Sequence, residues 1–73
     1  MNDNENIGIA YFDRDNRLLH FANGWEGSLE AAEEDAQDKL NRGIYHRAVQ
    51  ATVYRGRTPE IGEVLRTVRQ SRR

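Results

Sequence analysis

The segment Ser28–Gly43 reads SLEAAEEDAQDKLNRG and carries the pattern of one amphipathic helix. Ser28 can cap a helix by accepting a hydrogen bond from a free first-turn N–H group. Gly43 can take the left-handed conformation in which helices commonly end. Between them, apolar residues recur at helical spacing and form one narrow stripe, which consists of Leu29, Ala32, Ala36 and Leu40. We therefore expect a helix from Ser28 to Arg42 that packs this stripe on the rest of the domain.

The opposite face of this predicted helix is acidic. Glu30, Glu34 and Asp38 recur every four residues, and Glu26 precedes them in the same spacing. Like charges four residues apart repel each other by a few tenths of a kcal/mol per pair. The row is compatible with an ordinary solvated helix face and also with a surface that engages a basic partner.

Length and composition indicate a small, single-domain protein. The chain has 73 residues and no Cys, so a disulfide framework is excluded and oligomerisation is one way to bury more area. We expect a disordered N-terminus over residues 1–5, one α+β domain over 6–70 and a basic end over 71–73. No apolar run is long enough for a membrane span and the first residues are acidic, which predicts a cytoplasmic protein without a membrane partner.

The net charge of −1 hides an asymmetry between the two halves of the chain. Residues 1–41 hold ten acids against three bases, which gives −7, and residues 42–73 hold eight Arg against two Glu, which gives +6. Arginine suits bidentate contact with carboxylate or phosphate. The halves can neutralise each other within the fold, or either can meet a partner.

Three segments have the alternation of β-strands. Residues 7–12 and 17–22 flank the polar turn 13–16 and predict a hairpin. Gly8 and Ala10 leave one face of the first strand thin, so another group is expected to pack closely there. Residues 44–55 are rich in β-branched and aromatic residues and predict a long third strand.

The last segment has the start signals of a second helix. Thr58 suits the N-cap and Pro59 the first helical position. An apolar stripe at helical spacing follows, formed by Ile61, Val64, Leu65 and Val68. The predicted fold is a β-β-α-β-α domain: a three-stranded antiparallel sheet in the order 2-1-3, with both helices on one face. The stripe also motivates a homodimer.

The sequence offers little catalytic chemistry. It lacks a Gly-rich phosphate loop and a Cys nucleophile, and Ser28 is placed at a helix end. His20 and His46 could meet across paired strands, with Asp13 or Asp15 nearby, but histidines on half-polar strands are usually surface residues. We therefore predict a non-enzymatic protein with no metal and no cofactor.

Two classes of partner remain open. The first hypothesis is a regulatory protein that binds a basic protein surface, as in a phage-type or bacterial inhibitor that mimics a nucleic acid. Its binding residues would be Trp25, Glu26, Glu30, Glu34 and Asp38. Trp25 could instead cap the edge of the core. The alternative is a nucleic-acid-binding accessory protein with Tyr45 or Tyr54 as stacking faces. It would use Arg55, Arg57, Arg66, Arg69 and Arg73.

Overall fold

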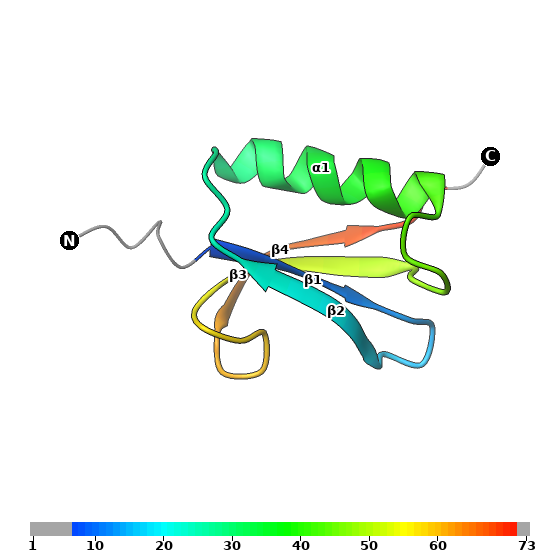
Figure 1. Cartoon of the computed structure of the whole chain (residues 1–73), viewed down its shortest axis with the longest axis horizontal. Coiled ribbons are helices and arrows are strands. Elements are labelled where there is room, and N and C mark those ends of the chain that lie inside the picture. The colour runs from blue at the N-terminus through cyan, green and yellow to red at the C-terminus, as the bar shows by residue number, and fades with distance from the viewer. Residues whose placement is uncertain (1–6, 72–73) are drawn as a thin grey trace.

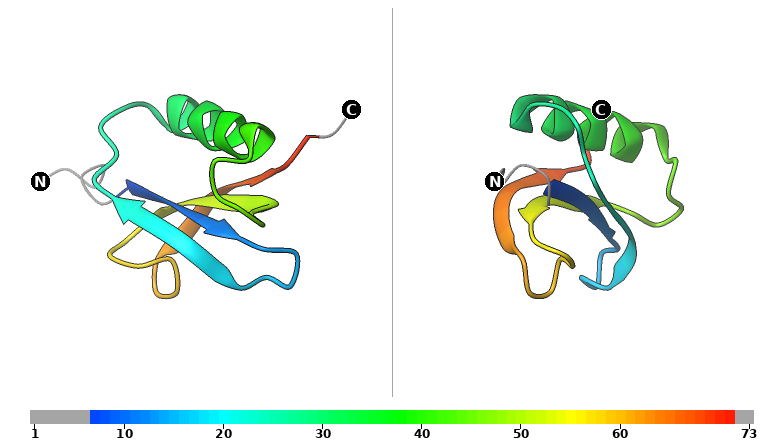
Figure 2. Two further views of the ribbon diagram at one scale, coloured as in Figure 1. Left: turned by 45° about the vertical axis from the view of Figure 1, so that its right-hand side comes forward. Right: turned by 60° about the vertical axis from the view of Figure 1, so that its left-hand side comes forward.

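The computed structural model describes residues 7–71, in which one helix covers one face of a four-stranded antiparallel sheet (Figure 1). The strand order is β2-β1-β3-β4, and every neighbouring pair is antiparallel. In chain order the elements are β1 (Ile7–Phe12), β2 (Leu18–Asn23), α1 (Leu29–Arg42), β3 (Gln50–Arg55) and β4 (Glu63–Arg69). Figure 2 shows α1 on one side of the twisted sheet, and its closest contacts are with β3 and β4.

Both ends of α1 lie where the sequence predicts them. The Ser28 hydroxyl accepts a hydrogen bond from the Ala31 N–H at 3.0 Å. Gly43 ends the helix in the left-handed conformation, with φ 69°. Ala32, Ala36 and Leu40 are buried against the sheet, which confirms the narrow apolar stripe.

The predicted hairpin is also confirmed. The Asp13 carboxylate accepts hydrogen bonds from the N–H groups of Asp15 and Arg17, both at 2.9 Å, and so closes the turn. The register shifts at the turn end of the ladder, because Tyr11 pairs with His20 whereas the next residue of β1 pairs with Leu18. This extra residue on β2 is a β-bulge.

The third strand is shorter than predicted, since only Gln50–Arg55 of the expected 44–55 forms β3. The Ala48 N–H donates to the Tyr45 carbonyl at 3.0 Å, and Arg47 takes a positive φ of 75°. These features make a turn between α1 and β3. β-Branched composition predicts an extended backbone but gives no sign of a left-handed residue such as Arg47. The sequence-based prediction therefore started the strand too early.

The predicted second helix is wrong, and its place is taken by one turn and a strand. The Gly62 N–H donates to the Thr58 carbonyl at 2.9 Å, so the helix start signals produce a single turn. The chain then pairs with β3 as β4. Two physical effects favour the strand: Val64 and Val68 are β-branched, and β3 would otherwise present unpaired backbone at an open edge. The predicted order 2-1-3 is retained and extended by a fourth strand.

Without the second helix, its apolar stripe does not exist as one face. Ile61 is 78% exposed and Val64 is 53% exposed, whereas Val68 is buried. The argument for a homodimer from this stripe therefore fails, and dimerisation stays a prediction that light scattering can test.

On the face of the sheet away from α1, the segment between β3 and β4 curls beneath one end of the sheet, at the lower left of Figure 1. Tyr54 is fully buried on this face, and its hydroxyl donates to the Asn23 side-chain oxygen. The Asn23 amide nitrogen in turn donates to the Arg57 carbonyl at 2.5 Å. A Cβ on Gly8 would lie 2.5 Å from the Tyr54 hydroxyl oxygen, which confirms the close packing expected over the thin strand.

Two sequence-based expectations concern the ends of the chain, and a third concerns the membrane. The N-terminus predicted to be disordered, residues 1–5, lies outside the described residues, as do residues 72 and 73 of the basic end. Within residues 7–71, α1 is too short and too polar to span a bilayer.

Candidate functional site

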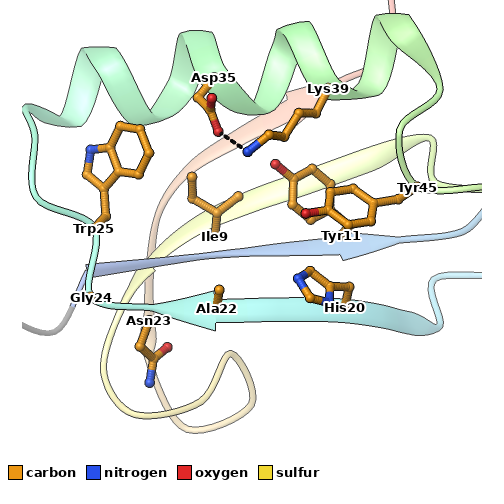
Figure 3. A pocket seen from close by; sticks show the side chains of 10 residues that line it. All are labelled: Ile9, Tyr11, His20, Ala22, Asn23, Gly24, Trp25, Asp35, Lys39 and Tyr45. Atoms are coloured by element: carbon orange, nitrogen blue, oxygen red, sulfur yellow. Dashed lines mark hydrogen bonds and ion pairs between the residues drawn. The ribbon is translucent and has the colours of Figure 1, made fainter.

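A groove of about 140 Å³ lies between α1 and the edge strand β2 (Figure 3). It exists because α1 packs mainly over β3 and β4 and leaves the same face of β2 partly uncovered. Ile9 and Ala22, which pair across β1 and β2, contribute an apolar part of its lining. The groove is therefore a consequence of the strand order and of the position of the helix.

An aromatic cluster forms one side of the groove. The hairpin register places Tyr11 opposite His20. Tyr45, from the turn after α1, stacks on His20 with 4.7 Å between ring centroids and an interplanar angle of 20°. Its ring also lies 4.4 Å from that of Tyr11. The turn that shortens β3 thus brings an aromatic ring to the groove.

Trp25 bounds the other end of the groove, beneath the start of α1 (Figure 3). Its indole N–H donates to the Ser28 carbonyl at 3.1 Å. A Cβ on Gly27 would lie 2.9 Å from the indole nitrogen, so glycine at that position allows the ring to lie back over the core. Trp25 is half-buried and packs against the core, so it is an edge residue of the core with one accessible side.

An ion pair from α1 forms the polar wall. The Lys39 ammonium lies 2.9 Å from the Asp35 carboxylate, and the two side chains are 36% and 30% exposed. This hydrogen bond raises the pKa of Lys39 above its usual value, so the ammonium keeps its proton at neutral pH. The wall is therefore polar but carries no net charge.

The hydroxyl of Tyr11 is the unusual group of this site. Tyr11 is only 3% exposed, and its hydroxyl has no hydrogen-bond partner among the described residues. Burial first, and then the charges of Asp35 and Tyr45, raise the pKa of Tyr11 well above its usual value. The phenol is thus a neutral donor, and because buried polar groups are normally paired, its missing partner requires an explanation.

The four acids predicted to bind a protein lie away from this groove and are exposed. Glu26 precedes α1, and Glu30, Glu34 and Asp38 lie along the outer face of the helix. Within residues 7–71, the ion pair of this row is that of Asp38 with Arg42, at 3.2 Å.

The arginines of the nucleic-acid alternative do not form the helical face expected for them. Arg66 pairs with Val53 and Arg69 with Gln50, so the two alternate between opposite faces of the sheet. Arg55 lies 3.8 Å from Glu63, Arg57 is exposed in the β3–β4 loop, and Arg73 lies outside the described residues.

The two tyrosines proposed as stacking faces differ in their exposure. Tyr54 is fully buried, so the prediction that it stacks on a base is wrong. Tyr45 is half-buried and already stacks on His20. Of the two rings, Tyr45 is the one that keeps an accessible side.

The structure places only one of the two histidines at the groove. His20 lines the groove, whereas His46 is exposed in the turn before β3 and is absent from the groove lining. In the part of the chain that the structure describes, no group of three or more acidic or histidine side chains could hold a metal ion.

Sequence reasoning missed Tyr11, Asp35 and Lys39 as members of one site. The sequence predicted the hairpin, but a β-bulge shifts its register so that Tyr11 lies opposite His20, and the turn length alone does not show this pairing. The position of Tyr45 depends on the turn around Arg47, for which the sequence has no clear signal. Comparison of the chain with protein-family models, curated proteins and solved structures finds no match.

Proposed function

We propose that the protein is a small non-enzymatic regulatory domain that binds a basic protein surface through the outer face of α1. The acids that would make this contact are called the acidic row, which consists of Glu26, just before the helix, and Glu30, Glu34 and Asp38 on it. The supporting observation is how α1 distributes its acids. Glu33 faces Arg66 at 3.8 Å and Asp35 holds Lys39, so the flanking acids are neutralised within the domain.

The acidic row is neutralised far less. Asp38 has an exposed partner in Arg42, and among residues 7–71 the other three acids form no ion pair. Exposed pairs contribute about 0–1 kcal/mol, so Arg42 is readily exchanged for a partner's cation. Carboxylates four residues apart rise by about 6 Å along the helix. This spacing resembles that of phosphates along a strand, which supports mimicry of a nucleic acid towards a basic protein.

The test is affinity capture from nuclease-treated host lysate with two charge-matched variants. Glu30, Glu34 and Asp38 are changed to Lys in the first variant. Asp15, Glu60 and Glu63, which are exposed acids outside α1, are changed to Lys in the control. We expect a basic protein that wild type and the control retain and the first variant loses, with retention that weakens as salt rises.

The stability of the first variant must be checked by circular dichroism. Loss of Glu30 removes a favourable first-turn charge worth roughly 0.3–1 kcal/mol. Capture of the same protein by the folded first variant would contradict the proposal.

A further inference from the structure

The groove between α1 and β2 has the size of a single ring. Its volume is about 140 Å³, and Ile9, Ala22 and the aromatic side chains form much of its lining. An apolar cavity of about 150 Å³ in another protein accepts benzene. A monocyclic molecule therefore fits here.

The Tyr11 hydroxyl gives this groove a specific hydrogen-bonding group. The residue is 97% buried, yet the hydroxyl has no partner within residues 7–71. The groove-lining neighbour Tyr45, whose ring lies 4.4 Å from that of Tyr11, is partly exposed, so a shift of its side chain opens a path to the hydroxyl and leaves the Asp35–Lys39 pair intact. A ligand with a hydroxyl or carbonyl oxygen would supply the missing acceptor.

The charges of the groove select against an ionic ligand. Asp35 and Lys39 are 2.9 Å apart and neutralise each other, so a charged ligand would have to break this pair. The exposed sides of Trp25 and Tyr45 instead offer aromatic surface, which attracts another ring in offset or edge-to-face geometry.

We propose that this groove binds one uncharged aromatic ring that carries a hydrogen-bonding oxygen, as in a phenol. Tyr11 donates the hydrogen bond, and Trp25 and Tyr45 bracket the ring. This ligand site is separate from the acidic row, because it faces β2 whereas the row faces solvent.

The test uses p-cresol and toluene, which differ by one hydroxyl. Trp25 is the only Trp of the chain, so its fluorescence reports on the groove, and NMR shifts of Ile9 methyl groups give a second readout. We expect saturable p-cresol binding with a Kd on the order of 1 mM, as befits a ligand of this size. Toluene should bind about 3- to 10-fold more weakly, which corresponds to one neutral hydrogen bond.

Two variants separate the contributions of the hydroxyl and of the space. Tyr11→Phe should weaken p-cresol about 3- to 10-fold and leave toluene unchanged. Ala22→Leu fills the groove from an exposed position of β2 and should abolish binding of both probes. Reversal of Glu30, Glu34 and Asp38 to Lys should leave both affinities unchanged, so this test is independent of the protein-binding proposal.

The same ring could belong to a free metabolite or to a tyrosine side chain. N-acetyltyrosine amide distinguishes these sources: its exclusion supports a free phenol, and binding as tight as that of p-cresol supports a side chain. Absence of saturable p-cresol binding, or equal p-cresol affinity in wild type and the Tyr11→Phe and Ala22→Leu variants, would overturn the proposal.

Discussion

Tyr11 and Tyr54 lie on the two central strands of the sheet, and their side chains are buried on opposite faces. The Tyr54 hydroxyl donates to Asn23, which the Arg57 carbonyl holds in place. The Tyr11 hydroxyl has no such partner within residues 7–71 and borders a groove. Two chemically identical side chains thus differ in whether the fold completes their hydrogen bonding.

The difference follows from what covers each face. The β3–β4 segment closes over Tyr54, and packing there is tight enough that Gly8 has no room for a Cβ. On the other face, α1 covers β3 and β4 more closely than β2, and small Ala22 adds to the open space. One tyrosine is therefore part of a completed core, and the other is available to a ligand.

The largest expected effect comes from adding atoms to each face. Gly8→Ala places a methyl group 2.5 Å from the Tyr54 hydroxyl oxygen, and overpacking of this kind costs about 1–3 kcal/mol. The matched change, Ala22→Leu, adds more atoms on the groove side but should change stability by less than about 0.5 kcal/mol. Urea unfolding measures both values. Equal losses would show that the groove side is as filled as the other face.

Alkaline pH should lower the stability of the domain through both buried tyrosines. Burial raises the pKa of Tyr54, and burial with nearby charge raises that of Tyr11, above the ordinary value of 10.0. Above about pH 10 the unfolded chain therefore binds fewer protons than the folded one, and stability falls as pH rises. The expected slope is about 1.4 kcal/mol per pH unit for each tyrosine until the folded-state group ionises.

Lys39 contributes in the same direction, because Asp35 raises its pKa and the ion pair is lost when the ammonium deprotonates. Urea unfolding between about pH 8 and pH 11 measures the slope. Tyr11→Phe and Tyr54→Phe should each remove the contribution of one tyrosine to this slope of stability against pH. A stability that stays constant across this range would contradict the burial of both groups.

A smaller effect distinguishes the two hydroxyls directly. Tyr54→Phe removes the donor to Asn23 and should destabilise the domain by about 0.5–1.5 kcal/mol. Asn23→Ala tests the same bond from the other side, and the two changes should be less than additive, because they remove one shared interaction. Full additivity in a double-mutant cycle would mean that the bond does not contribute.

The sequence allowed better prediction of the groove side, with Tyr11, than of the opposite face, with Tyr54. The hairpin and α1 have strong local signals: the Asp13 turn, the Ser28 cap and the Gly43 stop. These signals fix α1 and the pairing of β1 with β2, so the two sides of the groove could be located from local patterns. The β-bulge that sets Tyr11 opposite His20 has no such local signal.

The rest depends on long-range pairing. Thr58 and Pro59 start a single turn whose local signals are the same as those of a helix start. The following residues become β4 because they pair with the otherwise open edge of β3. With a second helix predicted in place of β4, the sequence could not show that Tyr54 is covered by the β3–β4 segment. The orphaned Tyr11 hydroxyl is likewise a property of packing, which no spacing of residue types records.

The central claim is that the Tyr11 hydroxyl serves binding at some expense of stability. The most direct measurement is urea unfolding of wild type and Tyr11→Phe, each with and without p-cresol. Without p-cresol, Tyr11→Phe should be equally stable or more stable by up to about 1 kcal/mol, since it removes an unpaired buried hydroxyl. At ten times the wild-type Kd, p-cresol should stabilise wild type by about 1.4 kcal/mol and the variant by about half as much. A less stable variant, or equal stabilisation of both proteins, would contradict the claim.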